Sequence, residues 1–316
     1  MANSARKIQE GLGHIKEAEK YLKTSFFKWS PDYDSAADRY NKAAVCFKVA
    51  RSHEKAKDAF KKTAECYESN GQLFHAAKAL TEAANISADL KNYKDTMILM
   101  QKACLLYREH GTPDTACINL VTLAKMIEGA VPLEAINLYE KAAEIAENDE
   151  KFRESANHLN NASRLLIKSA EYLKAGVVMK KQVEIYAKVE NYPMIYNIVL
   201  GQVLVYLMSG DLVAAENCYK NAFEFNGFAL SDAAEALEKI LEAYSSGDNK
   251  TLKLWTSKPI VNCQEIAVAR LGKLLKAPEG GGGFDEFAPS DDQTEEITKT
   301  VKQLEIKDEE LEEGIC

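Results

Sequence analysis

The sequence predicts an all-α protein, built as a solenoid of antiparallel helical hairpins with a C-terminal helical bundle. Small residues recur about every 20 positions, breaker residues recur at a matching interval, and no stretch alternates in the way a strand does. One helix plus one turn accounts for such a period, so successive hairpins would stack into a TPR-like α-solenoid. The small positions form a ladder of Ala37, Ala56, Ala76, Thr96, Ala116, Ala135, Ala156 and Ala175.

A second row of small residues follows the first, and a large side chain stands between the two rows. Ala76, Leu80 and Ala83 illustrate the pattern. Residues spaced by three, four and seven positions share one face of a helix, so a neighbouring helix can approach closely at the small residues. We therefore expect the whole ladder to be core, and function to depend on residues outside it.

The first region, residues 1–33, reads as a helix over residues 4–23 and then an aromatic loop. Ile8, Leu12 and Ile15 have helical spacing. The loop carries Phe26, Phe27, Lys28 and Trp29 shortly before a proline. Two interpretations remain open for these aromatics: they fold back to cap the solenoid, or they contact the membrane interface, where aromatics beside lysine are favoured.

The ladder occupies residues 34–190, and its first helix is expected to start with Asp34 or Ser35 as the N-cap. Residues 191–277 predict a helical bundle, with helices over 194–209, 212–225, 231–246 and 251–256 and one last helix over 260–276. Residues 278–316 read as a glycine linker and an acidic tail that is expected to be mostly disordered.

Composition excludes several classes of function. The net charge is −8, and residues 284–316 alone carry twelve acidic residues against three lysines, so the rest of the chain is almost neutral. This balance argues against nucleic acid as a partner and favours protein partners. The seven cysteines form no CxxC pair, which is typical of a reduced, cytosolic chain. No apolar run is long enough to span a bilayer.

The sequence offers no recognisable catalytic chemistry. It lacks a phosphate-binding GxxxxGK[ST] loop, an HExxH pair and a GxSxG elbow, and its five histidines are scattered. We therefore predict no enzymatic activity, no cofactor and no metal site.

Several segments together resemble the soluble NSF attachment proteins, and most closely the gamma form of that family. The resemblance rests on Tyr21 to Thr24, Phe26 to Trp29 and Pro31 to Ala37 near the N-terminus. It continues through Leu73 to Lys78, His110 to Ala116 and Ala162 to Leu166, and reaches the Asn-Tyr-Pro at 191–193. It covers roughly residues 4–276 and also the acidic C-terminus that ends in an apolar residue.

The resemblance implies an adaptor that coats assembled SNARE four-helix bundles (syntaxin-like) and recruits the hexameric ATPase NSF, which then disassembles them. The expected role is in membrane fusion and in vesicle-mediated, intracellular protein transport, and the expected location is cytoplasmic, peripherally associated with membranes. The solenoid would contact SNAREs, with Arg51, Lys57, Lys94 and Arg164 as candidates. The aromatic loop would contact the bilayer through Phe26, Phe27, Lys28 and Trp29.

The chain end is the candidate contact for NSF. It combines acid with apolar residues at Glu309, Glu310, Leu311, Glu312, Glu313 and Ile315. Acidic side chains would be steered to a basic groove, and the apolar ones would give the contact geometric definition. A solubilising tail without a partner is the simpler alternative. For the chain as a whole, the alternatives are a generic TPR-like scaffold that binds peptides, or an enzyme's regulatory subunit.

Overall fold

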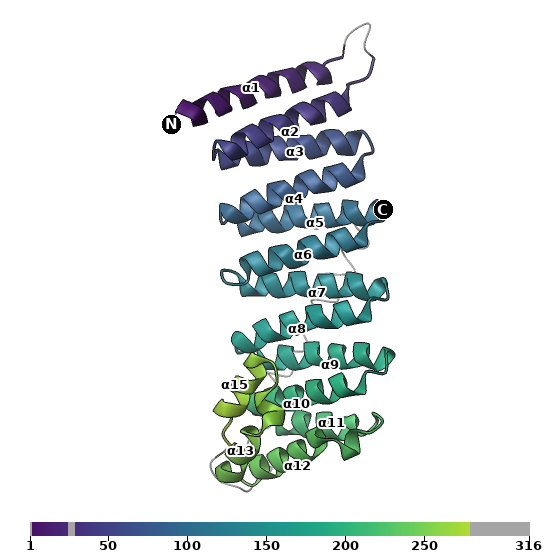
Figure 1. The fold of residues 1–316 in the computed structure, drawn as a ribbon, viewed down its shortest axis with the longest axis vertical. Coiled ribbons are helices and arrows are strands. Elements are labelled where there is room, and N and C mark those ends of the chain that lie inside the picture. The colour runs from purple at the N-terminus through teal and green to yellow at the C-terminus, as the bar shows by residue number, and fades with distance from the viewer. Residues whose placement is uncertain (1, 25–28, 279–316) are drawn as a thin grey trace, which may run out of the picture.

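The computed structural model describes residues 2–24 and 29–278, and within these ranges it contains helices and no strand. Helices α1 to α11 follow one another down the long axis in chain order, each antiparallel to the last (Figure 1). The all-α solenoid predicted from the sequence is thereby confirmed. The first eleven helices are α1 (Ala2–Leu22), α2 (Tyr33–Val49), α3 (His53–Ser69), α4 (Leu73–Asp89), α5 (Tyr93–Glu109), α6 (Pro113–Ile127), α7 (Pro132–Asn148), α8 (Phe152–Lys168), α9 (Tyr172–Lys188), α10 (Tyr192–Met208) and α11 (Leu212–Ala222).

The period of 20 comes from a nearly uniform unit. Helices α2 to α5 and α7 to α10 each have 17 residues, and most of the turns between them have three. The middle residue of such a turn is left-handed, for example Gly71 at φ 70° and Arg51 at φ 57°. In the α2–α3 turn the N–H of Ser52 donates to the carbonyl of Phe47 at 2.9 Å. This six-to-one bond is that of a Schellman motif, which ends a helix while satisfying its last carbonyls.

The ladder lies in the core as predicted. Ala37, Ala76 and Ala116 are fully buried, and so are the other members of the row. The large side chains between the two small rows are buried as well, and Tyr139 is completely enclosed. Small residues let the helices approach and large ones fill the spaces between them, so a period in side-chain size produces the stack.

The first ladder helix begins two residues or more before the predicted position, at Tyr33. Its N-cap is Asp32, whose carboxylate accepts a hydrogen bond from the N–H of Ser35 at 3.0 Å. The prediction of Asp34 or Ser35 as the cap was therefore wrong. Several cap-forming residues stand close together here, and Tyr33 already has helical geometry, so the first of them takes the role.

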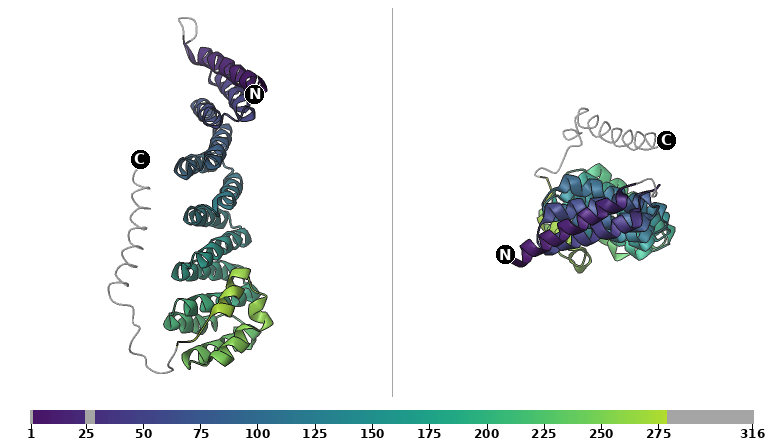
Figure 2. Two further views of the ribbon diagram at one scale, coloured as in Figure 1. Left: turned by 90° about the vertical axis from the view of Figure 1, so that its left-hand side faces the viewer. Right: turned by 90° about the horizontal axis from the view of Figure 1, so that it is seen from above.

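The chain then folds back on the stack. After η1 (Phe228–Leu230) come α12 (Asp232–Ser245), α13 (Asn249–Thr256), α14 (Pro259–Asn262) and α15 (Ile266–Leu274). Helix α15 packs against α8 and α10, on one face of the solenoid (Figure 2).

The single helix predicted over 260–276 is wrong, because the chain breaks between α14 and α15. The Gln264 amide in the break donates to the Ile260 carbonyl at 3.0 Å and to the Asn197 side chain at 3.1 Å. Glu265 then caps α15 by accepting the N–H of Ala267. These hydrogen bonds replace the helical ones that a continuous helix would have made.

Candidate functional site

Alternation of the helices gives the stack two faces and two edges. Even-numbered helices form one face, which we call the even-helix face, and odd-numbered helices form the odd-helix face. Turns that lead from an even helix to an odd one, beginning with residues 50–52, lie along what we call the Arg51 edge. Turns that lead from an odd helix to an even one, among them residues 70–72, lie along the opposite edge, which also carries Trp29 and which we call the Trp29 edge (Figure 1).

Ion pairs tie together helices that share a face. On the even-helix face Lys48 of α2 contacts Glu82 of α4, with Nζ 2.6 Å from the carboxylate oxygen. On the odd-helix face Lys102 reaches Glu68, and Lys188 reaches Glu147. Much of the surface charge is therefore satisfied within the molecule. A lysine is available to a partner only where no such neighbour exists.

The structure places Arg51 and Lys94 where a partner can reach them. Both side chains are exposed, and neither makes an ion pair with the described residues. Arg51 occupies the left-handed position of the α2–α3 turn, and Lys94 is the second residue of α5, so both lie along the Arg51 edge.

Lys57 is instead engaged within the stack. Only 10% of its side chain is exposed, and its Nζ lies 3.0 Å from Glu54 and 3.2 Å from Asp95 of α5. Its hydrogen bond with Glu54 raises the pKa of Lys57 despite burial. Burial opposes ionisation of Asp95, yet hydrogen bonds from Lys57 and Ser87 hold the pKa of that carboxyl below its usual value. These contacts make Lys57 a link between α3 and α5.

The ladder register alone did not indicate this burial. Lys57 directly follows a ladder residue, and at the equivalent positions Ile136 is buried whereas Asp38 and Asn157 are exposed. The pairing of Lys57 with Asp95 of α5 is a contact between helices that the register does not encode.

Arg164 also has a partner inside the molecule. It lies near the end of α8, where its guanidinium contacts the Glu128 carboxylate at 2.8 Å, and the Tyr139 hydroxyl also hydrogen bonds to that carboxylate. All four cationic candidates thus lie toward the Arg51 edge. Arg51 and Lys94 are free there, whereas Lys57 and Arg164 hold neighbouring helices together.

An apolar row near the same edge was missed from the sequence. Leu133, Leu173 and Val213 are the second residues of α7, α9 and α11, and they are 55%, 44% and 65% exposed. The signal that could have revealed them is their spacing of 40 residues, the period of a whole hairpin. Equivalent positions on parallel helices line up, so these side chains form one row on the odd-helix face.

Of the four residues in the predicted membrane contact, Trp29 alone lies within the described residues. Its side chain is 90% exposed on the Trp29 edge, while Phe26, Phe27 and Lys28 lie outside the described residues. This exposure shows that the Trp29 side chain does not fold back onto the stack to cap it. Among the helices of the described residues, none has the length and apolar character needed to cross a membrane.

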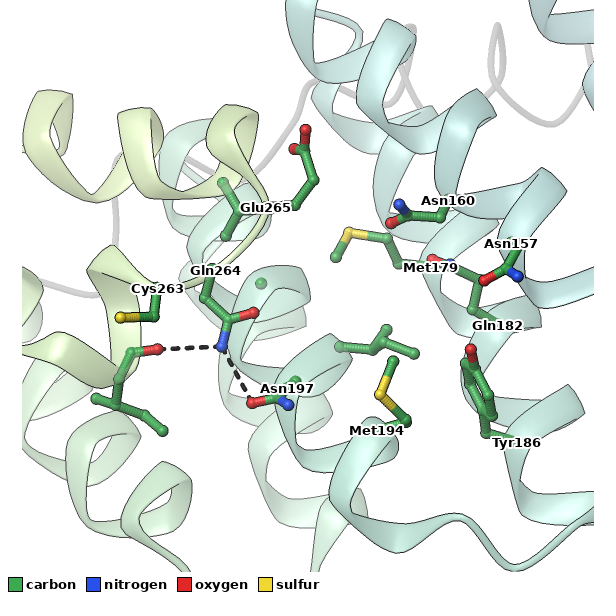
Figure 3. Close-up of a pocket in the computed structure, with 14 residues that line it drawn as sticks. Asn157, Asn160, Met179, Gln182, Tyr186, Met194, Asn197, Cys263, Gln264 and Glu265 are labelled. Carbon is green, nitrogen blue, oxygen red and sulfur yellow. Dashed lines mark hydrogen bonds between the residues drawn. The ribbon is translucent and has the colours of Figure 1, made fainter. Parts of the chain in front are cut away.

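A cavity of about 370 Å³ lies where the C-terminal helices fold back on the stack (Figure 3). Its lining is rich in neutral amides, contributed by Asn157 and Asn160 of α8, Gln182 of α9, Asn197 of α10 and Gln264 between α14 and α15. Side-chain amides both donate and accept hydrogen bonds, so this lining suits a polypeptide backbone. The predicted acidic contact formed by Glu309, Glu310, Leu311, Glu312, Glu313 and Ile315 lies outside the described residues.

Taken together, the extended stack, its buried ladder of small residues and its exposed edges define a helical-repeat protein of the kind that binds other proteins along its length. A family model described as "Soluble NSF attachment protein, SNAP" matches residues 9–254. The chain therefore belongs to the soluble NSF attachment protein family. Members of this family are adaptors rather than enzymes.

Relatives in three organisms agree with the family match. The chain is 28% identical to a gamma-soluble NSF attachment protein of Dictyostelium discoideum over 86% of this chain and 84% of that one. It is 27% identical to the gamma protein of Arabidopsis thaliana over 89% and 96%. It is 26% identical to an alpha-soluble NSF attachment protein of Vitis vinifera over 84% and 97%. Among solved structures, the crystal structure of C. therm. Get4 aligns with a TM-score of 0.40 and 12% identity over 91% of this chain and 95% of that one.

Proposed function

We propose that this chain is an adaptor that binds assembled SNARE four-helix bundles and recruits and stimulates the NSF ATPase, so that the bundles are taken apart during vesicle trafficking and membrane fusion. It would act in the cytoplasm, peripherally associated with membranes. The family match over residues 9–254, together with the gamma-type relatives, is the observation that carries the proposal.

The SNARE contact would lie along the Arg51 edge. Arg51 and Lys94 supply unpaired positive charge, and the row formed by Leu133, Leu173 and Val213 supplies apolar area on the same edge. Charge would steer the encounter with an acidic helical bundle, and the apolar row would add affinity that does not depend on salt.

The other two contacts would use different residues. Trp29, with Phe26, Phe27 and Lys28, would touch the bilayer surface. The chain end, with Glu309, Glu310, Leu311, Glu312, Glu313 and Ile315, would engage NSF. This arrangement would let one molecule bind its SNARE cargo, the membrane and the ATPase at the same time.

The deciding experiment measures ATP hydrolysis by NSF, and disassembly of a soluble SNARE bundle, with and without the purified chain. Stimulation of both is expected. A chain that neither binds the bundle nor stimulates NSF would overturn the proposal. In that case a peptide-binding scaffold becomes the better reading, since the amide-lined cavity favours it.

Charge-reversal variants distinguish a specific SNARE contact from non-specific charge attraction. Arg51→Glu with Lys94→Glu should weaken bundle binding by about tenfold or more, because two favourable contacts become repulsive. Lys78→Glu is the matched control for each of these two changes made singly, because Lys78 is also exposed but lies within α4 on the even-helix face. Equal losses from Lys78→Glu and from the single changes would indicate non-specific charge attraction and reject this edge as the site.

Truncation tests the NSF contact. Ile315→Ala should reduce stimulation of NSF, and deletion of residues 309–316 should reduce it further, while bundle binding survives because the stack is untouched. Full stimulation by the truncated chain would place the contact elsewhere, for example on α15 with Arg270 and Lys273.

A further inference from the structure

Three side chains with metal-binding groups meet between α1 and α2, and none of them belongs to the contacts proposed above. A carboxylate oxygen of Glu10, a ring nitrogen of His14 and the thiol of Cys46 all lie within 4.8 Å of one another. Glu10 is exposed, His14 is half-buried and Cys46 is buried. The cluster is therefore anchored in the core and open to solvent on one side.

Backbone geometry brings these groups together. Glu10 and His14 are four residues apart on α1, so their side chains lie on the same face. Between them is Gly11, where an added Cβ would lie 2.8 Å from the ring of Phe47. Only a glycine permits this approach of α1 to α2. Because Cys46 adjoins Phe47, the close approach places its thiol beside the two α1 side chains.

The polar contacts at this point are incomplete. The Nδ1 atom of His14 is buried and has no hydrogen-bond partner, and the nearest carboxylate, that of Glu17, is 3.6 Å away. A buried nitrogen without a partner costs free energy. The other charges near the cluster are Lys7, 2.8 Å from Glu10, and Arg39, 3.0 Å from Glu17.

We propose that Glu10, His14 and Cys46 bind a divalent zinc ion that links α1 to α2. Sulfur, nitrogen and oxygen are the donors that zinc accepts in tetrahedral sites, at about 2.0–2.3 Å. Tetrahedral donors are then about 3.5 Å apart, so small side-chain rotations bring the three into range. Glu17 or a water molecule occupies the fourth position.

Charge and protons balance when the ion binds. When the ion binds, the Cys46 thiol releases its proton to solvent. The Glu10 carboxylate breaks its ion pair with the Lys7 ammonium and coordinates the metal instead. One thiolate and one carboxylate then neutralise the two positive charges of zinc. The bond from the core thiol to the end helix fixes α1, whose last turn leads directly into the Trp29 edge.

The full-length chain, purified without metal, is titrated with Zn²⁺ and separately with Co²⁺, which reports a thiolate ligand through a near-ultraviolet absorption band. We expect one equivalent to bind, a thiolate band with Co²⁺ and a rise in Tm with Zn²⁺. Cys46→Ala should abolish the thiolate band, and Glu10→Gln, an exposed change that leaves packing intact, should weaken binding at least about tenfold.

Cys104→Ala is the matched control, because Cys104 is a buried thiol of α5 far from α1. It should leave stoichiometry, band and affinity unchanged. Failure to bind Zn²⁺, a Co²⁺ complex without the thiolate band, or equal affinity in the Glu10→Gln protein would each overturn the assignment. If Cys46→Ala fails to fold, Glu10→Gln and His14→Ala still decide the question.

Discussion

Replacement of Trp29 by Ser tests the proposed membrane contact directly. The side chain is 90% exposed, so the change should leave the free energy of unfolding within about 0.5 kcal/mol. A tryptophan offers roughly 200 Å² of surface. If half of it enters the interface, about 100 Å² at about 25 cal/mol per Å² contributes about 2.5 kcal/mol. The change should therefore lower the partition coefficient onto vesicles by about 60-fold.

The small number of tryptophans allows the membrane contact to be measured by tryptophan fluorescence. It contains two tryptophans, and the other, Trp255, is partly buried with the Lys258 ammonium 3.1 Å from its ring centre. A Trp255→Phe protein leaves Trp29 as the sole reporter, and its fluorescence should shift to the blue when vesicles are added. Vesicle flotation of the Trp29→Ser protein gives the partition coefficient independently.

Two results would refute this reasoning. An unchanged emission spectrum with bound vesicles would show that Trp29 stays in water. A loss of thermal stability in the Trp29→Ser protein would show that the side chain packs on the stack. Disassembly of soluble SNARE bundles should be unaffected, because that reaction involves no bilayer.

The remaining predictions concern the stack. Ala76→Leu should overpack a fully buried position and lower the free energy of unfolding, measured by denaturant titration, by about 1–3 kcal/mol. An unchanged denaturation midpoint would mean that the packing around Ala76 can accommodate a larger side chain. Gly71→Ala should cost about 1 kcal/mol from its φ of 70° alone, since its new Cβ would touch nothing, whereas Gly13→Ala in α1 should stabilise by about 0.5–1 kcal/mol. The two substitutions should therefore change the free energy of unfolding in opposite directions. Equal changes would contradict the left-handed geometry of the turn. Lys57→Ala should cost about 1–2 kcal/mol because Asp95 loses its cation, and a smaller loss than that of Lys94→Ala would contradict its role as a link.

The helical stack could be predicted because small side chains recur at a fixed interval along the sequence. Each ladder residue such as Ala116 meets only a neighbouring helix, so the information that buries it is local and repeats. The three-residue turns repeat as well, since the middle residue of each is left-handed. The sequence alone was therefore enough to predict the succession of helices and the small residues at which neighbouring helices pack.

Contacts between distant segments were not predictable in this way. The break before α15 depends on the Gln264 amide reaching Asn197, 67 residues earlier in the chain. The engagement of Arg164 depends on Glu128 at the end of α6. The Glu10, His14 and Cys46 group joins two helices at a spacing that matches no short motif. Side chains that look free in a sequence acquire partners only when the stack is assembled.

The outer side of α1 has a consequence for how copies of the chain can associate. Its buried side carries Ala18 and its half-buried residues include Leu12, whereas Arg6, Gln9 and Lys16 point to solvent. The far end is closed by α12 to α15. A repeat stack with open apolar ends would polymerise head to tail into fibres, and both ends here resist that. Copies of the chain that bound one rod-shaped partner would therefore have to lie side by side around it, and not end to end along it.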